Sequence, residues 1–258
     1  MKLQPTIRLL GRTLAGAALA AVACCGPCGA QIPTYNVGST PTGVPFTFLD
    51  VKTNTIQGAM VDLITAIGDD AGFKVVVQAT PFSALIPSLT SNKIDIISAA
   101  MLINASRKEV IDFSDPVFPY PEGMVVNSDD NTPYKSFTEL KGQVVGAQVG
   151  TVYIDFLKKN GDFAEVKVYD SLADILRDVS LGRIKAGFGD EPILKYQLSQ
   201  NPGFKAKLVP TYEPKMSGSV GIGVRKSDTE LLNKINASLA RLRANGTLDK
   251  ILAKWHLQ

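Results

Sequence analysis

Apolar and polar positions alternate along the first half of the chain in a way that predicts short strands separated by amphipathic helices. Strands are predicted at residues 34–39, 73–80 and 94–100, and helices at 58–72 and 82–93. In the first helix, apolar residues recur at helical spacing, and Gly72 follows as a stop. Alternating strands and helices of this kind indicate a mostly parallel sheet with helices on both faces.

The same rhythm restarts after residues 119–137, a segment rich in proline, asparagine and aspartate. Strands are predicted at 143–150, 165–170, 185–190 and 217–226, helices at 151–161 and 171–183, and one or two amphipathic helices over 228–255. The two units share the alternation of strands and helices but not their amino-acid sequence. The fold class is therefore predicted as α/β, with two units of similar construction.

The first thirty residues differ from the rest of the chain. They begin with Lys2, Arg8 and Arg12, continue with an apolar run over 13–23, and end in small residues. The run is too short to span a bilayer, and this order is typical of a secretory signal peptide. We therefore expect residues 1–30 to be a signal peptide and the protein to be periplasmic.

Removal of the signal peptide changes the charge and the cysteine content. Residues 1–30 carry three of the 27 basic residues and none of the 24 acidic ones, so residues 31–258 have 24 of each. A formally neutral protein gives no reason to expect a nucleic-acid partner. All three cysteines precede residue 30, so cleavage after Ala30 would leave no thiol. The alternative is a lipoprotein that is cut before Cys24 and carries a lipid there.

Several polar residues stand at predicted helix starts, where side chains can bind anions or cap the helix. Asn104 is a good N-cap for residues 105–110, which would place Arg107 in the first helical turn. From these residues alone, Arg107 is either an exposed arginine or an anion-binding one. Asp190 is likewise either a helix cap or a binding residue. With His256 as the one histidine, no metal site and no cofactor are expected.

The order of these segments resembles solute-binding protein family 3, the periplasmic amino-acid-binding receptors of ABC importers. The resemblance runs from about Tyr35 to Trp255. The segments that carry it are "VGSTPTGVPFTF", "GAMVDLITAIGDDAG", "LIPSLTSNKIDII" with Arg107 and "IDFSDP", "GAQVGT", "LGRIKAGFGD" and "GIGVRKSD" with "NGTLDKILAKW".

The resemblance implies a two-lobed fold of the type II periplasmic-binding-protein kind, with mixed, mostly parallel sheets and two hinge strands. The first lobe would comprise residues 31–123 and 222–258, and the second lobe residues 124–221. The hinge would pass through residues 123–127 and 217–223. A ligand would lie between the lobes, which would close over it.

The resemblance also implies the ligand site. Arg107 would bind a carboxylate with its planar guanidinium, Thr151 would contact the same group from the second lobe, and Asp190 would hold an ammonium group. Phe82 would form an apolar wall, with a core phenylalanine as the alternative. The full set of expected ligand-binding residues is Arg107, Asp190, Thr151, Phe82, Leu102, Thr40, Gly43, Ala100 and Gly150.

Five positions depart from the family pattern, and one of them is Asn104, which stands where threonine is common. Gly43 stands where an aromatic wall residue is frequent, and Leu102 stands where a hydroxyl side chain is usual. Thr40 replaces an acid that is frequent in receptors for basic amino acids, which argues against a basic ligand. Lys185 replaces an aspartate, a change for which the sequence offers no explanation.

The expected function is that of a binding protein that captures an amino acid or an amino-acid-like compound and delivers it to the permease of an ABC transporter. One alternative is a periplasmic enzyme on the same fold, similar to cyclohexadienyl dehydratase, with Asp190 or Glu191 as an acid catalyst. Another is a ligand-sensing receptor. We expect a small-molecule ligand and a membrane permease as partners, and no catalytic residues.

Overall fold

The computed structural model of the protein describes residues 31–257. From Ile32 onward the chain forms one compact unit. The signal peptide expected over residues 1–30 lies outside the described residues, and so does Cys24. Within residues 31–257, no helix has the length and apolar character needed to cross a membrane.

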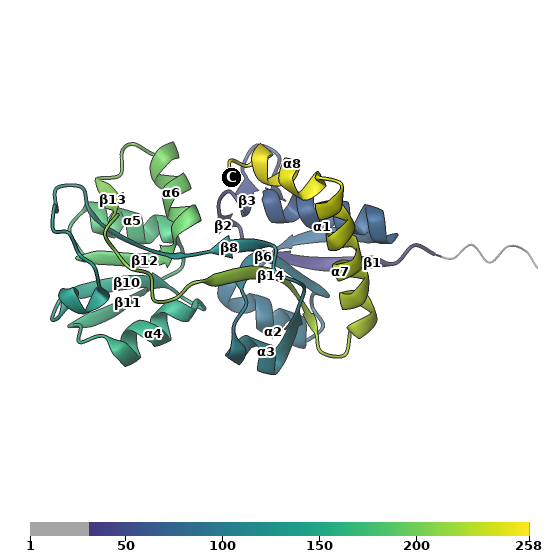
Figure 1. The fold of residues 1–258 in the computed structure, drawn as a ribbon, viewed down its shortest axis with the longest axis horizontal. Coiled ribbons are helices and arrows are strands. Elements are labelled where there is room, and N and C mark those ends of the chain that lie inside the picture. Colours follow the sequence, from purple (N-terminus) through teal and green to yellow (C-terminus); the bar gives the residue numbers. More distant parts are fainter. Residues whose placement is uncertain (1–30, 258) are drawn as a thin grey trace, which may run out of the picture. The chain divides into compact units, whose positions relative to one another are not determined.

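The first sheet is built from six strands and is mixed (Figure 1). Its strands are β1 (Thr34–Ser39), β5 (Lys74–Ala79), β6 (Ile96–Leu102), β7 (Ile111–Phe113), β8 (Phe118–Tyr120) and β14 (Gly218–Arg225). The order is β5-β1-β6-β14-β7, with β8 pairing β14 beside β7. Strands β5, β1 and β6 are parallel, whereas β14 is antiparallel to β6, β7 and β8.

The second sheet has five strands in the order β11-β10-β12-β9-β13. They are β9 (Glu122–Asn127), β10 (Val144–Gln148), β11 (Glu165–Tyr169), β12 (Ala186–Asp190) and β13 (Ala206–Leu208). Strand β10 is parallel to both β11 and β12, and β9 is antiparallel to β12 and β13. A small antiparallel sheet is formed by β2 (Thr42–Gly43), β3 (Thr47–Asp50) and β4 (Thr55–Gln57).

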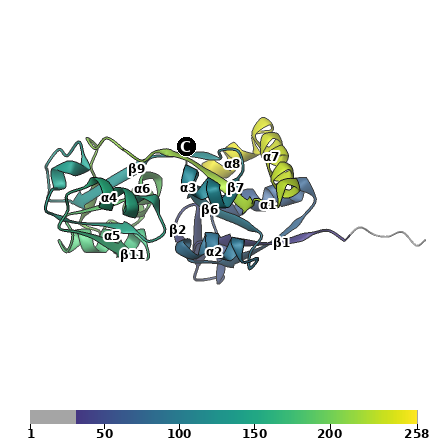
Figure 2. The same ribbon diagram turned by 90° about the horizontal axis from the view of Figure 1, so that it is seen from below.

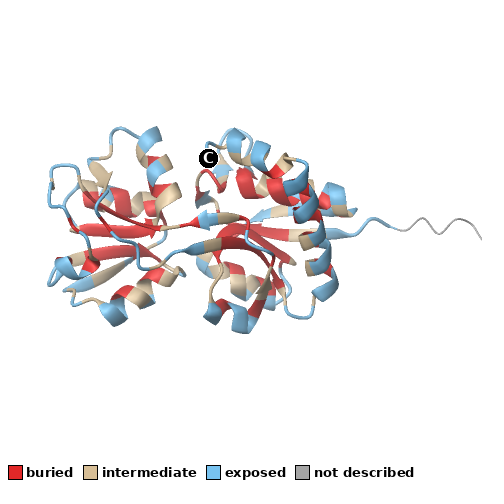
Figure 3. Cartoon of the chain, in the orientation of Figure 1, coloured by how far each residue is buried: buried red, intermediate tan, exposed pale blue. Residues whose placement is uncertain are grey.

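Helices cover both faces of each large sheet, as the alternating pattern predicts (Figure 1). On the first sheet, α1 (Ala59–Ala71), α7 (Thr229–Ala244) and α8 (Thr247–Lys254) lie on one face, and α2 (Leu85–Thr90) and α3 (Ala105–Val110) on the other. On the second, α5 (Leu172–Ser180) and α6 (Glu191–Gln200) lie opposite α4 (Val152–Asn160). The central strands are accordingly buried, while the outer helix faces are exposed (Figure 3). The predicted α/β class with two mixed sheets is confirmed. The sheets are not mostly parallel, because four of their strand pairings are parallel and five are antiparallel.

The segments with strong periodicity adopt the predicted elements, and local residue chemistry sets their limits. The helix predicted over 58–72 spans Ala59–Ala71 and ends where Gly72 adopts a φ of 77°, a left-handed conformation that glycine accepts without strain. The helix predicted over 82–93 is shorter. It consists of a 3₁₀ turn at Phe82–Ala84 and then α2, because Asn92 turns the chain with a φ of 60°.

The chain passes between the two large sheets twice, and the two passages run side by side (Figures 1 and 2). On the way out, β8 belongs to the first sheet up to Tyr120, and β9 joins the second at Glu122. On the way back, β14 belongs to the first sheet from Gly218. The division into lobes at residues 123 and 221 remains a prediction, and these strand limits put each change of sheet a few residues earlier.

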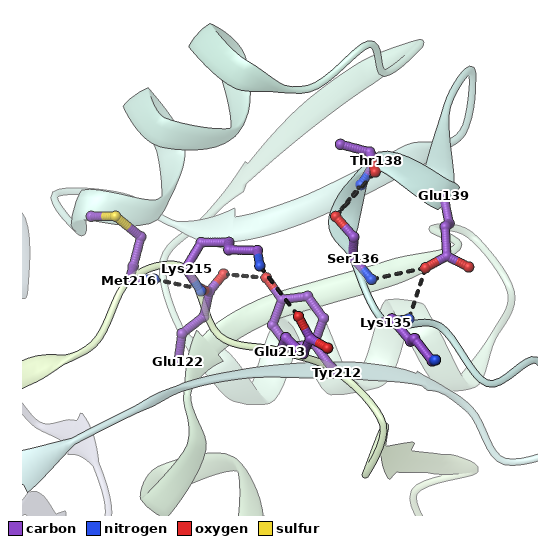
Figure 4. A network of polar contacts seen from close by, with 9 residues as sticks. All are labelled: Glu122, Lys135, Ser136, Thr138, Glu139, Tyr212, Glu213, Lys215 and Met216. Carbon is purple, nitrogen blue, oxygen red and sulfur yellow. Dashed lines mark hydrogen bonds and ion pairs between the residues drawn. The ribbon is translucent and has the colours of Figure 1, made fainter.

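One buried carboxylate ties the two passages together (Figure 4). Glu122 is 1% exposed. Its Oε2 atom accepts hydrogen bonds from the backbone N–H groups of Lys215 and Met216, each at 2.9 Å, and its Oε1 accepts one from the Tyr212 hydroxyl at 2.9 Å. Burial raises the pKa of Glu122, and the three hydrogen bonds oppose this because they favour the ionised form. The Glu122 side chain therefore holds the return passage to the outgoing one, in addition to the backbone ladder between β8 and β14.

We expect Glu122→Ala to lower the free energy of unfolding by about 2–4 kcal/mol, because three buried donors lose their acceptor. Glu122→Gln should lose much less, since an amide can still accept from the two N–H groups and donate to the hydroxyl. The measurement is urea unfolding followed by circular dichroism. The control, Glu213→Ala, removes an exposed neighbouring carboxylate and should change the free energy by less than about 0.5 kcal/mol. Equal losses for Glu122→Ala and the control would contradict the role given to Glu122.

Candidate functional site

The polar residues of the candidate site come from the ends of strands and the starts of helices. Arg107 lies in the first turn of α3, as predicted, and the Asn104 side chain caps that helix by accepting a 2.8 Å hydrogen bond from the Arg107 N–H. Asn104 follows β6 closely, so the cap fixes the angle at which the chain leaves the first sheet. Arg107 is thereby set at the carboxyl end of a central strand.

The guanidinium of Arg107 is buried and binds two backbone carbonyls, one at the end of β6 in the first sheet and one in the loop between β10 and α4. The side chain is 8% exposed. It donates from Nη1 to the Leu102 carbonyl at 2.6 Å and from Nη2 to the Gly150 carbonyl at 3.0 Å. The central carbon of the guanidinium, Cζ, lies 5.6 Å from the centre of the Phe82 ring, a distance typical of a cation–π interaction. Phe82 is thus a wall beside the charge, as the resemblance implies.

Gly150 can take its position only because it has no side chain. Its φ is 76°, and a Cβ atom there would lie 2.8 Å from the Cα of Ser83. The close approach brings the Gly150 carbonyl to Arg107 from the loop before α4. The neighbouring Thr151 hydroxyl donates to the Gln148 carbonyl at 2.6 Å, so it closes the turn and makes no capping bond to α4.

Asp190 ends β12 immediately before α6, and its carboxylate binds a phenol. The Tyr153 hydroxyl donates to Oδ1 of Asp190 at 2.7 Å. The side chain makes no capping hydrogen bond to α6, which removes the main support for a purely structural role as a helix cap. Burial raises the pKa of Asp190 to about 6, opposed by the Tyr153 hydrogen bond and the Arg107 charge.

Arg107 and Asp190 line one enclosed cavity. The other residues that line it are Phe82, Ala100, Leu102, Thr151, Val152 and Tyr153. Burial lowers the pKa of Arg107, whereas the charge of Asp190 raises it. Arginine keeps its proton in any case, because its pKa starts above 12. The cavity has a volume of about 10 Å³, which is enough for about one water molecule.

A larger groove adjoins the cavity on the other side of Arg107. It has a volume of about 510 Å³, and it shares Arg107, Thr151 and Val152 with the enclosed cavity. Gly150 lines the groove, together with Met216 from the return passage. The guanidinium therefore stands between a small enclosed space and an open one.

The structure brings seven of the nine predicted residues together around Arg107. They are Arg107, Asp190, Thr151, Phe82, Leu102, Ala100 and Gly150. Thr40 and Gly43 do not line either space. Thr40 is buried next to Thr42, and Gly43 pairs with Thr47 in the small sheet.

The structure also accounts for the unexplained Lys185. Its ammonium forms a 2.7 Å ion pair with Asp130 and lies 6.0 Å from the centre of the Tyr134 ring. These contacts lie within residues of the second sheet and its loops, away from the cavity. Lys185 therefore serves a local contact rather than the site.

Sequence reasoning missed Tyr153 and the strain at Ala100. Tyr153 lies in the first turn of α4 and lines the cavity, and nothing in its local sequence marks it as a partner of Asp190. Ala100 has a φ of 49° within β6, a left-handed conformation that is costly for residues other than glycine. It coincides with an irregular register between β6 and β14. Backbone strain of this kind gathers at binding sites.

Comparisons with known proteins show what the chain as a whole is similar to. Residues 35–258 match the model of the bacterial extracellular solute-binding proteins, family 3. The ABC transporter arginine-binding protein 1 of Escherichia coli (strain K12) is 31% identical over 224 residues, which cover 86% of this chain and 90% of that protein.

Two solved structures are similar over most of the chain. An ancestral arginine-binding protein bound to glutamine has a TM-score of 0.80 and 36% identity, and the match covers 88% of this chain and 100% of that one. The ancestral amino acid-binding protein AncCDT-1, a precursor of cyclohexadienyl dehydratase, has a TM-score of 0.77 and 30% identity, with 86% and 94% coverage.

We expect Asp190→Asn to raise the melting temperature by about 2–4 °C at pH 7.5 and by less at pH 4.5. The pKa of Asp190 is raised to about 6 from 3.8, so its contribution to stability is fully present below about 4 and is lost as the pH rises through 6. Asparagine carries no charge at either pH and keeps an oxygen for Tyr153. Differential scanning calorimetry at both pH values measures this, with the exposed Asp129→Asn as control. An equal gain at both pH values would contradict the burial of an ionised Asp190.

Proposed function

The chain belongs to family 3 of the bacterial extracellular solute-binding proteins, and on this basis we propose that it captures an amino acid or a close relative and delivers it to the permease of an ABC transporter. One observation carries the proposal. Two side chains of opposite fixed charge, Arg107 and Asp190, line the same cavity. A free amino acid offers a carboxylate and an ammonium group, and recognition of both requires such a pair.

The arginine has the geometry to bind a carboxylate. Its two terminal nitrogens already donate to carbonyl oxygens, Nη1 to Leu102 and Nη2 to Gly150. A carboxylate offers two oxygens in a plane that a guanidinium can bind at once, with charge-assisted hydrogen bonds that are stronger than those to a neutral carbonyl. The Gly150 carbonyl belongs to the loop between β10 and α4, on the second sheet. We expect a ligand carboxylate to replace this carbonyl as the acceptor of the Arg107 Nη2 hydrogen bond.

Binding of an amino acid between Arg107 and Asp190 requires the walls of the cavity to move. An enclosed space of about 10 Å³ does not hold an amino acid. The walls contributed by α3 and by the loop before α4 must first separate and then close again on the ligand. A ligand drives such closure only through contacts that it makes better in one arrangement than in the other. A zwitterion held between Arg107 and Asp190 makes such contacts.

The cavity walls favour a ligand with an uncharged side chain. Phe82, Ala100, Leu102 and Val152 are apolar, and among the described lining residues Asp190 is the sole acid. A basic side chain would need a second acid, and the nearest one that lines either space within the described residues is Asp155 in the adjoining groove. The similar protein from E. coli is named for arginine, so this chain would differ from it in ligand. The ancestral arginine-binding protein is solved bound to glutamine, whose side chain is uncharged.

The remaining parts of the proposal follow from family membership. We propose a periplasmic location, a membrane permease as partner, and two lobes that meet at the passages near Glu122 and Gly218. Support for the lobes comes from the two separate sheets. Support for the location comes from the family, whose members are extracellular solute-binding proteins.

A second candidate function is favoured by the chemistry of Asp190. A carboxyl with a pKa of about 6 can act as a general acid near neutral pH, and one similar structure is the precursor of an enzyme. Incubation with prephenate and arogenate tests this, because product formation would reveal turnover. A product that Asp190→Asn abolishes would establish the enzyme and displace the pure binding role.

A thermal-shift screen tests the binding proposal. We expect at least one standard amino acid with an uncharged side chain to raise the melting temperature of residues 31–258, and arginine to bind at least tenfold more weakly by calorimetry. Specific binding stabilises the folded state by mass action. Arginine as the tightest ligand would refute the uncharged class, and no shift with any amino acid would refute the proposal itself.

We expect Arg107→Ala to weaken amino-acid binding at least 100-fold and Arg107→Lys at least tenfold, because lysine cannot bind a carboxylate with two parallel hydrogen bonds. Isothermal titration calorimetry measures both, and circular dichroism checks the fold. Arg183→Ala removes an exposed arginine that pairs with Asp178 and serves as control. Unchanged affinity in Arg107→Ala would show that the carboxylate binds elsewhere.

A further inference from the structure

The hydroxyl of Tyr120 is a buried polar group without a partner. Tyr120 is 1% exposed, and its Oη atom makes no hydrogen bond to any residue of 31–257. Leaving such a group unpaired costs the free energy of its desolvation. Tyrosine hydroxyls that are buried usually find a partner. An unpaired one therefore calls for an explanation in terms of what it binds.

The ring of Tyr120 is held firmly, so the position of its hydroxyl is well defined. It packs edge-to-face against Phe46, with ring centres 5.2 Å apart. Its backbone pairs with Gly218 in the ladder between β8 and β14. Two residues later, Glu122 anchors the same segment to the return passage (Figure 4). Tyr120 is thus fixed on both sides of the point where the chain changes sheets.

The same segment runs beside Asp190. Glu122 is paired with Asp190 in the antiparallel ladder between β9 and β12, so the two side chains are on the same face of the sheet. The N–H of Glu191 donates to the carbonyl of Pro121 at 3.0 Å, which extends the contact toward Tyr120. Burial and then the charge of Asp190 raise the pKa of Tyr120 well above its ordinary value, and the phenol keeps its proton.

An ammonium group has three N–H donors, and Asp190 alone does not satisfy them. One of its oxygens, Oδ1, already accepts from Tyr153. A phenol oxygen can accept one hydrogen bond while its own proton points elsewhere. The Tyr153 hydroxyl already donates to Asp190, whereas the Tyr120 oxygen makes no hydrogen bond within residues 31–257.

We infer that Tyr120 is a further ligand-binding residue, whose hydroxyl oxygen accepts a hydrogen bond from the ammonium group that Asp190 neutralises. The inference rests on the proposed function, because it assumes an amino-acid ligand. It assigns ligand recognition to a segment that connects the two sheets.

The test compares wild type with Tyr120→Phe, which removes the hydroxyl and keeps the ring against Phe46. The probes are the twenty standard amino acids and, for each that binds, the carboxylic acid that lacks its α-amino group. Calorimetry at pH 8 should show a loss of about tenfold for the amino acid and less than twofold for the acid. The melting temperature without ligand should stay equal or rise, because an unpaired buried group is gone. Tyr35→Phe, near the start of β1 where its ring packs against Phe73, is the matched control and should change neither.

Each other outcome has a defined meaning. Unchanged affinity for the amino acid, or an equal loss for both probes, overturns the inference. A loss that appears only below pH 7, with full affinity at pH 8, also overturns it, because Tyr120 would then act through the protonation of Asp190. If no amino acid binds the wild type, the proposed function fails, and the inference fails with it.

Discussion

The hydrogen bonds that the Glu122 carboxylate accepts are the constraint on which the rest of the structure depends. The chain leaves the first sheet at Tyr120 and returns at Gly218, and between these points it builds an entire second sheet. The N–H groups of Lys215 and Met216 bind the side chain of a residue on the outgoing passage. Nearly one hundred residues of chain are closed by these contacts. Any rotation of one sheet relative to the other must therefore occur within a few residues on either side of Glu122.

The same residue links this constraint to the site. Glu122 is opposite Asp190 in the ladder, and its charge adds to the rise in the pKa of Asp190. Arg107 approaches from the other direction and opposes that rise. The pKa of Asp190 is thus set in opposite directions by Arg107, the proposed carboxylate-binding residue, and by Glu122, which contacts the return passage. A positive group that binds Asp190 relieves its repulsion with Glu122, so recognition and the connection between the sheets share one electrostatic field.

Sequence periodicity and local chemistry predicted the longer strands and helices and one helix cap, because these features depend on residues that are close in sequence. The strands β1, β6 and β10 and the helix α1 follow from apolar spacing, and the Asn104 cap follows from its own side chain. The short strands β2, β4 and β8 were not predicted, because two or three residues carry no periodic signal. Tyr153 and Glu122 were missed for a different reason. Their partners lie 37 and 90 or more residues away in the chain, and only the assembled sheets bring them together.

The site consists of groups that are individually unfavourable in the folded protein. Burial lowers the pKa of Arg107 and raises that of Asp190, the Tyr120 hydroxyl has no partner within residues 31–257, and Ala100 is in a left-handed conformation. A ligand that supplies a carboxylate and an ammonium group satisfies these groups, whereas an analogue that lacks one of them leaves a charge or a donor buried and unpaired. Discrimination against such analogues is large because an unmade buried hydrogen bond costs more than a made one contributes. In the proposed function, selectivity for the zwitterion would therefore come from the same buried groups that lower the stability of the protein without ligand.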